Sequence, residues 1–286
     1  MDILYQIRSC LDDLSTGEAR IARLMLDDVG FAASASLEEL ARRAEVSAAT
    51  LSRFARSIGC RDLRQLRLQL AQASGVGSRF LDPGASTEAS GFYRQIVGDI
   101  EATLHRHLAG FEEAQFADAV RLLGRARMIH AFGTGGCSTL CSAELQVRLV
   151  RLGYCIAACH DPVMMRVTAA SLGSQHAVIA CSLSGLTPEL LDAVTLARSY
   201  GAGVLAITLP DSPLAGLADV LLPLHSAETP FIYKPTAARY GMLLAIDVLA
   251  TELALAMPDD NQERLRRIKL ALDHYRGGAD SLPLGD

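Results

Sequence analysis

Five short apolar runs alternate with helical patterns between residues 127 and 224, and this alternation constrains the fold more than any other feature. Continuous apolar runs of this length are typical of strands buried on both faces, and repeated strand–helix units produce parallel sheets. We therefore predict an α/β protein that contains a five-stranded parallel sheet flanked by helices. The expected strands are Arg127–Phe132, Tyr154–Cys159, Ala177–Cys181, Gly203–Thr208 and Val220–Leu224.

Helical patterns occupy the intervals between these strands and the segments on either side of them. Residues 91–124 predict two helices before the first strand, and His105 and His107 on the first of these are expected at the surface or at an interface. The remaining expected helices are Thr139–Leu152, Pro162–Leu172, Pro188–Tyr200, Thr236–Met257 and Asn261–Arg276.

Two of the predicted strands end in loops that are rich in glycine and hydroxyl groups. GTGGCS at 133–138 follows the first strand, and SLSGLT at 182–187 follows the third. Free backbone N–H groups and the dipole of the next helix favour an anion at such a loop, and Ser182, Ser184 and Thr187 add hydroxyl donors. The second loop predicts a site for a phosphate-sized ligand, with a capped turn that binds nothing as the alternative.

The first loop does not complete the G-x-G-x-x-G pattern of a dinucleotide fold, because no third glycine follows near Thr139. Asp161, after the second strand, lies between His160 and Pro162 and is poorly placed to bind a ribose. Seven cysteines occur without C-x-x-C pairs or metal-ligand spacing, so we expect no cofactor and no metal site. These thiols are expected to be small buried hydrophobes in a reducing compartment, with a thiol switch at Cys137 as the alternative.

The first 75 residues predict a separate helical domain. Ser15 and Ser36 each precede a helical pattern with a glutamate three residues later, which is the sequence of a capping box. After a tight turn, Ser47 is expected to cap a helix over Ala48–Ile58, and a further helix follows at Asp62–Ala73. Two short helices joined by a tight turn predict a helix-turn-helix, with a helical bundle of basic surface as the alternative.

Positive charge is concentrated in this first domain. Residues 42–79 contain eight arginines against two acidic residues, although the whole chain carries a net charge of −5. Small residues at the front of the helix over 48–58 allow its backbone to approach base edges in a major groove, and the arginines beyond them suit phosphate or guanine. The candidate DNA-binding residues are Ser47, Ala48, Ala49, Thr50, Ser52, Arg53, Arg56, Arg64 and Arg67.

A helix-turn-helix protein usually binds a palindrome as a two-fold dimer, so we expect a double-stranded DNA operator and a homodimer or homotetramer. Residues 1–75 are the predicted DNA-binding domain, 76–90 a linker rich in serine, glycine and proline, and 91–286 a second domain. The start of the chain lacks the apolar core of a signal peptide, and the apolar segment Tyr240–Met257 contains two acidic residues. We expect no membrane partner and a cytoplasmic location.

Four stretches resemble a known family: VSAATLSRFARSIG at 46–59, FGTGGCS at 132–138, CSLSGLTPEL at 181–190 and SPLAGLADVLLPL at 212–224. Over essentially its whole length the chain resembles bacterial transcription regulators of the RpiR family, which join a helix-turn-helix to a sugar isomerase (SIS) domain that binds phosphosugars. It is most similar to the hexose-catabolism repressor branch, through DDLSTGE at 12–18, DPVMMR at 161–166 and segments within 228–251. The resemblance implies a repressor of carbohydrate metabolism whose effector is a phosphorylated sugar acid such as 2-keto-3-deoxy-6-phosphogluconate.

By position, the resemblance also implies an effector site. Where many relatives carry a serine, this chain has Cys137, whose thiol is a weak hydrogen-bond donor, and Ser138 offers a hydroxyl beside it. Arg239 could bind an effector carboxylate or phosphate, or equally form a salt bridge between helices or subunits, and Lys234 is a weaker candidate of the same kind. The implied effector-binding residues are Gly133, Gly135, Cys137, Ser138, Ser182, Ser184, Gly185, Thr187 and Arg239.

The competing interpretation is a phosphosugar isomerase. Aldose–ketose isomerisation needs a general base beside the sugar carbons, and Glu144, His160, Glu189 and Glu228 are the candidates. The carboxylate of Glu189 also suits the positive end of its helix dipole without any catalytic role. Because a helix-turn-helix precedes the SIS region, we predict a regulator without catalytic residues.

Overall fold

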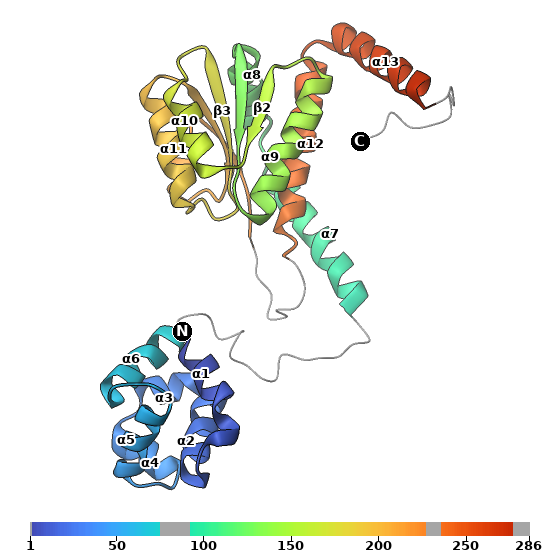
Figure 1. Ribbon diagram of the computed structural model, residues 1–286. Helices are drawn as coiled ribbons and strands as arrows, with labels where there is room; N and C mark the ends of the chain where they lie inside the picture. Colours follow the sequence, from blue (N-terminus) through green and yellow to red (C-terminus); the bar gives the residue numbers. More distant parts are fainter. Residues whose placement is uncertain (1, 75–91, 227–235, 277–286) are drawn as a thin grey trace. The chain divides into compact units, whose positions relative to one another are not determined.

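The computed structural model describes residues 2–74, 92–226 and 236–276 (Figure 1). These residues form two compact units, one from residues 2–74 and one from the two later ranges. The predicted linker at 76–90 lies outside the described residues.

The N-terminal unit is entirely helical, as the capping pattern predicts. The backbone N–H of Ser15 donates to the Glu18 carboxylate at 3.1 Å, which is half of the predicted capping box. The hydroxyl oxygen of Ser36 accepts from the backbone N–H of Glu39 at 3.2 Å. The elements are α1 (Ile3–Ser9), η1 (Leu11–Asp13), α2 (Thr16–Asp27), α3 (Val29–Ser34), α4 (Leu37–Arg43), α5 (Ala48–Ser57) and α6 (Leu63–Ser74).

Two features of this unit differ from the sequence-based expectation. The apolar residues Ile21, Leu24, Met25 and Val29 have helical spacing and predict one helix after Ser15, but that helix ends at Asp27, and Val29 begins α3. The reason lies in Asp28, whose side chain accepts from the backbone N–H of Phe31 at 2.9 Å and so starts a new helix. The unpredicted α1 starts in the same way, because Asp2 accepts from the backbone N–H of Tyr5.

The second unit contains the predicted five-stranded parallel sheet, with strand order β2-β1-β3-β4-β5. Each neighbouring pair is parallel, and the register aligns Ile129 of β1 with Ala177 of β3. The strands are β1 (Met128–Phe132), β2 (Ile156–Cys159), β3 (His176–Cys181), β4 (Gly203–Thr208) and β5 (Val220–Pro223). This confirms the predicted α/β fold and its sheet.

Helices cover both faces of the sheet (Figure 1). Helices α8, α9 and α12 bury Phe116, Leu145 and Met242 against one face, and α10 and α11 bury Met165 and Leu190 against the other. Helix α7 packs along α12. The helices of this unit are α7 (Phe92–Gly110), α8 (Glu113–Gly124), α9 (Gly136–Arg151), α10 (Pro162–Ala170), α11 (Pro188–Ser199), η3 (Ala215–Leu217), α12 (Ala238–Leu255) and α13 (Pro258–Tyr275).

The expectation that His107 lies at the surface or an interface is wrong, because its side chain is fully buried in this unit. Its Nδ1 lies 2.8 Å from the carbonyl oxygen of Thr103, and its Nε2 accepts from the backbone N–H of His225 at 3.0 Å. Gly241 of α12 packs against the ring so closely that an added Cβ would lie 2.3 Å from it. The absence of a side chain at Gly241 therefore makes room for the imidazole. His105, on the same helix, is exposed as expected.

Within the described residues, no single helix is long and apolar enough to cross a membrane. Helices α12 and α13 pass that test of length and composition only as a pair, and a bend of 111° separates them.

Candidate functional site

A pocket of about 500 Å³ opens where β1 and β3 end. These strands are neighbours in the sheet, yet their following helices α9 and α11 lie on opposite faces, so the two loops diverge at this point. Such a switch in strand order is where α/β sheets usually bind ligands, outside the carboxyl ends of the strands. The lining residues are Gly135, Gly136, Cys137, Ser138, Ser182, Leu183, Ser184, Thr187, Leu209 and Ser226.

The first loop brings the N-terminus of α9 to the pocket. Gly133 is buried, and a Cβ there would lie 2.2 Å from the carbonyl oxygen of Ser138, so only glycine lets the helix start pack on the end of β1. Gly135 has φ +75° and Gly136 has φ +30°, positive values that favour glycine at the start of α9. Gly133 is thus a packing residue, while Gly135 lines the pocket.

The second loop is held by its own hydroxyl groups. The Oγ of Ser182 accepts from the backbone N–H of Gly185 at 3.0 Å and lies 3.4 Å from Oγ1 of Thr187. Gly185 has φ +66°, and a Cβ there would lie 2.2 Å from Oγ of Ser212. Ser184 is exposed at the rim, where its Oγ accepts from the backbone N–H of Leu186 at 3.3 Å. The hydroxyl hydrogen of Ser184 therefore remains available to donate, whereas either Ser182 or Thr187 uses its hydrogen in the bond between them.

The structure brings six of the nine predicted effector residues into the pocket lining: Gly135, Cys137, Ser138, Ser182, Ser184 and Thr187. It does not place Gly133, Gly185 or Arg239 there. Arg239 stacks over the ring of Tyr240, and its Nη2 donates to the Tyr240 hydroxyl at 3.2 Å. Lys234, the weaker candidate, lies outside the described residues.

Sequence reasoning missed four lining residues, Gly136, Leu183, Leu209 and Ser226. Leu209 directly follows β4, and Ser226 lies three positions after β5. Because all strands are parallel, their carboxyl ends meet at one edge, and this rule could have located both residues from the predicted strands.

Cys137 lies on the second residue of α9 and is half-buried at the pocket wall. Its Sγ lies 3.8 Å from Sγ of Cys141 and 3.5 Å from Sδ of Met242. A hydrogen bond from the Cys141 thiol, helped by the charge of Arg239, lowers the pKa of Cys137 below the ordinary value for a thiol. Cys137 is therefore a more acidic thiol than a free cysteine.

None of the candidate isomerase bases among the described residues, Glu144, His160 and Glu189, lines this pocket. The carboxylate of Glu144 accepts from Nε of Arg148 at 2.6 Å along α9. Glu189 is exposed in the first turn of α11, and His160 follows β2 at the other side of the first loop. Glu228 lies outside the described residues. The described part of the pocket offers hydrogen-bond donors for an anion and no carboxylate to move a proton.

A second pocket of about 700 Å³ adjoins the first and shares Ser184, Leu209 and Ser226 with it. Arg106 of α7 and His225 contribute its nitrogen-bearing side chains. Together the two cavities offer room for a ligand larger than a phosphate group.

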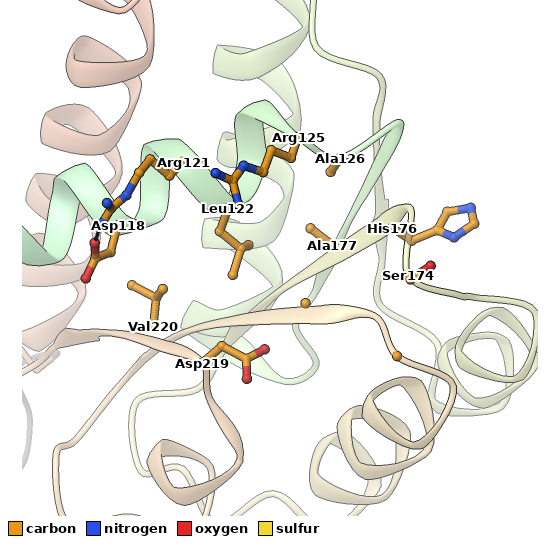
Figure 2. Close-up of a pocket in the computed structure, with 12 residues that line it drawn as sticks. Asp118, Arg121, Leu122, Arg125, Ala126, Ser174, His176, Ala177, Asp219 and Val220 are labelled. Carbon is orange, nitrogen blue, oxygen red and sulfur yellow. Dashed lines mark ion pairs between the residues drawn. The ribbon is translucent and has the colours of Figure 1, made fainter.

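Figure 2 shows a further cavity, of about 460 Å³, at the amino ends of the strands. Arg121 pairs there with Asp118, and the carboxylate of Asp219 accepts from the backbone N–H of Val204 at 2.8 Å. Its lining includes none of the predicted effector residues. The polar groups of this cavity hold one another and the sheet edge together.

The N-terminal unit carries the candidate nucleic-acid interface. Helices α4 and α5 are joined by a turn in which Glu45 has φ +51° and the backbone N–H of Val46 donates to the carbonyl of Ala41. Ser47 caps α5 as predicted, since its Oγ accepts from the backbone N–H of Thr50 at 3.2 Å. The two helices therefore have the form of a helix-turn-helix.

The predicted recognition face of α5 is open to solvent. Its exposed residues are Ser47, Ala48, Ala49, Arg53 and Arg56, with Thr50 and Ser52 half-buried. On α6, Arg64 is exposed, whereas Arg67 is half-buried and its Nε is enclosed without a hydrogen-bond partner among the described residues. Of the two, Arg64 is the better placed to contact a phosphate.

Helix α2 contacts both the turn before α5 and the last residue of α5. Arg20 forms an ion pair of 3.0 Å with Glu45 in the turn, and Glu18 accepts from the hydroxyl of Ser57 at 2.7 Å at the end of α5. These contacts orient the outer face of α5 relative to the rest of the unit.

Comparison with known proteins agrees with this architecture. Residues 1–75 match the helix-turn-helix domain of the rpiR family, and residues 122–252 match the SIS domain. The regulator HexR of Pseudomonas aeruginosa is 33% identical over 273 residues, which cover 95% of each chain. This chain belongs to the RpiR family of transcriptional regulators.

Two further similarities extend over nearly the whole chain. HexR of Escherichia coli is 30% identical over 288 residues, covering 100% of this chain and 99% of the relative. Among solved structures, the NanR protein of Vibrio vulnificus complexed with ManNAc-6P has a TM-score of 0.60 and 22% identity. It covers 94% of this chain and 98% of its own, and it supports the fold.

Proposed function

We propose that this RpiR-family regulator binds an operator through α5 and senses a phosphorylated sugar or sugar acid, such as 2-keto-3-deoxy-6-phosphogluconate, in the pocket between β1 and β3. Residues 1–75 would form the DNA-binding domain and residues 91–286 the effector domain. The observation that carries the proposal is the convergence of two hydroxyl-rich loops and two helix N-termini on one cavity. That donor set favours a compact dianion such as a phosphate group.

Hydrogen-bond donors supply the recognition of the phosphate. Ser138, Ser184 and Thr187 present hydroxyls to the cavity, and α9 and α11 point their N-termini toward it. The adjoining cavity would hold the rest of the sugar, and Arg106 would meet a carboxylate at the far end of a sugar acid. In agreement, the structurally similar NanR is complexed with ManNAc-6P.

Regulation would follow from linkage between the two ligands. An effector that prefers one arrangement of subunits shifts the population toward it, and so changes the affinity of the two recognition helices for a palindromic operator. This mechanism requires a homodimer or homotetramer, and it places the protein with the chromosome in the cytoplasm. The relatives named HexR are transcriptional regulators, which favours regulation of transcription over catalysis as the activity of this chain.

A mobility-shift assay on DNA from upstream of the gene, titrated with a panel of phosphosugars and phosphosugar acids, tests the proposal. We expect one compound to release the DNA, and we expect Ser184→Ala to weaken that release without weakening DNA binding. Ser199→Ala, at the opposite end of α11, is the matched control and should respond like the unaltered protein. Failure to bind this DNA at low salt, or release that is unaffected by Ser184→Ala, would contradict the proposal.

A further inference from the structure

Three sulfur atoms from two helices meet behind the wall of the effector pocket. Cys137 and Cys141 lie one turn apart on α9, and their Sγ atoms are 3.8 Å apart. Met242, on α12, brings its Sδ to 3.5 Å from Sγ of Cys137. The cluster thus brings the thioether of Met242 to two thiols of α9, although Met242 lies 105 residues after Cys137 in the chain.

The three residues of the cluster differ in how deeply they are buried. The side chains of Cys141 and Met242 are fully buried in the core that α9 and α12 form against the sheet. Cys137 is half-buried and lines the pocket, so it is the member of the cluster that faces this cavity.

The separation of the sulfur atoms suits three bonds to one ion. A metal–sulfur bond measures about 2.3 Å, and three sulfurs at that distance around a single ion lie about 4 Å from one another. The two separations from Sγ of Cys137, 3.8 Å to Cys141 and 3.5 Å to Met242, are close to that value. Two cysteines at positions i and i+4 of a helix lie on one face, which allows them to bind the same ion.

The kind of ligand restricts the kind of ion. Thiolate and thioether sulfurs are soft ligands that select Cu(I), whereas Mg²⁺ and Ca²⁺ require oxygen and structural Zn²⁺ requires four ligands from Cys, His or carboxylate. Within the described residues, no group of three His, Cys, Asp or Glu side chains could hold a metal ion. A site completed by a methionine is therefore open to a soft monovalent cation and closed to the harder ones.

We propose that Cys137, Cys141 and Met242 form a three-coordinate binding site for one Cu(I) ion. Cys137 loses its thiol proton as the ion binds, and Cys141 then releases a second proton to solvent through the pocket. The two thiolates and Cu(I) together carry one negative charge. No electron is transferred in this step. The site shares Cys137 with the effector pocket but does not depend on the proposed phosphosugar.

The test is an anaerobic titration of the reduced full-length protein with Cu(I), in competition with a coloured Cu(I) chelator. We expect one ion per chain to be held against the chelator. Cys137→Ser and Met242→Leu should each weaken binding by at least about tenfold. Substituting a residue that only supports a metal ligand already weakens metal binding by about tenfold or more, so removing a ligand should cost at least as much. Leu matches Met closely in volume, so the second variant should remain folded.

Two controls separate this site from general thiol binding. Cys155→Ser removes an exposed cysteine outside the cluster and should leave the affinity unchanged. Zn(II) should compete poorly with Cu(I), because the thioether of Met242 is a soft ligand that favours Cu(I). The proposal is overturned if the native chain retains no ion against the chelator, if Cys155→Ser weakens binding as much as Cys137→Ser, or if Met242→Leu binds Cu(I) as tightly as the native chain.

Discussion

At the scale of single residues, two glycines and one histidine decide whether the effector pocket can form. Gly133 allows Ser138 to pack against the end of β1, and Gly185 fits beside Ser212 in a backbone conformation that other residues rarely adopt. His107 holds the backbone of His225 beside the adjoining cavity. None of the three lines either cavity, yet each fixes the position of a segment that does.

Replacing Gly185 by alanine should destabilise the second unit by about 1–3 kcal/mol, because the new Cβ would be strained at φ +66° and would overlap Oγ of Ser212. Urea unfolding measures the change. Gly216→Ala is the matched control, since an added Cβ there meets nothing within 4 Å and its φ is not left-handed. An equal loss of stability in both variants would contradict the steric argument.

The buried His107 should make stability depend on pH. Desolvation, the largest cause, lowers its pKa in the folded state below the ordinary value of 6.5, so near that pH the unfolded chain binds a proton that the folded chain does not. Its contribution to stability is therefore complete above pH 6.5 and decreases as the pH falls from there toward the lowered pKa. Protonation would also remove the acceptor for the His225 N–H.

We expect His107→Gln to reduce the loss of unfolding free energy between pH 7 and about pH 5.5. His105→Gln, exposed on the same helix, should leave that loss unchanged. Denaturant unfolding at the two pH values makes the comparison. If both variants lose stability with pH as the native chain does, another group is responsible.

At the scale of elements, the recognition helix depends on its cap and on its charge. Ser47 begins α5, Arg20 and Glu18 of α2 hold contacts at its two ends, and its outer face is exposed. The cap acts on folding and the arginines act on DNA, so substitutions can separate the two roles.

Ser47→Ala should cost about 1 kcal/mol of stability, because the backbone N–H of Thr50 loses its acceptor. Ser47→Asp should keep that stability, since aspartate also caps helices, but its charge would repel DNA phosphates and weaken binding. Thermal unfolding and a mobility-shift assay distinguish the two effects. Tight DNA binding by Ser47→Asp would place Ser47 away from the interface.

Arg56→Ala should reduce the dependence of DNA affinity on salt by about one unit of logarithmic slope, the effect of losing one phosphate contact. Arg56→Lys retains the charge and should restore most of that slope. Fluorescence anisotropy over a range of salt concentrations provides the measurement. An unchanged slope in Arg56→Ala would show that this exposed arginine does not contact the phosphate backbone.

At the scale of the whole molecule, the proposed regulation requires that effector binding to one unit and operator binding to the other are energetically coupled. Coupling of binding free energies is reciprocal: an effector that changes operator affinity by some factor must itself bind with an affinity changed by the same factor when operator is present. This requirement applies whichever phosphosugar is bound and whichever oligomer forms.

We therefore expect the releasing phosphosugar to bind more weakly to the operator complex than to the free protein, by the same factor that it weakens operator binding. Isothermal titration with and without operator DNA measures both affinities. Equal effector affinities in the two titrations would mean that the pocket does not control DNA binding.

The sequence by itself determined the elements and their order. Strands, helix caps and the helix-turn-helix depend on neighbours within a few positions, so apolar periodicity and residues such as Ser36 and Ser47 predict them correctly. The loops after β1 and β3 line one pocket, as the shared edge of a parallel sheet requires. The helix break at Asp28 was missed because an aspartate can lie within a helix or cap a new one.

Only the tertiary structure decided which distant side chains meet. Met242 lies 105 positions from Cys137, and His225 lies 118 positions from His107, separations at which no local pattern specifies a contact. Those contacts depend on how α7, α9 and α12 pack, and that packing is set by the shapes of many side chains at once. Thus a histidine expected at the surface is buried, and a cysteine in a glycine loop becomes part of a sulfur cluster.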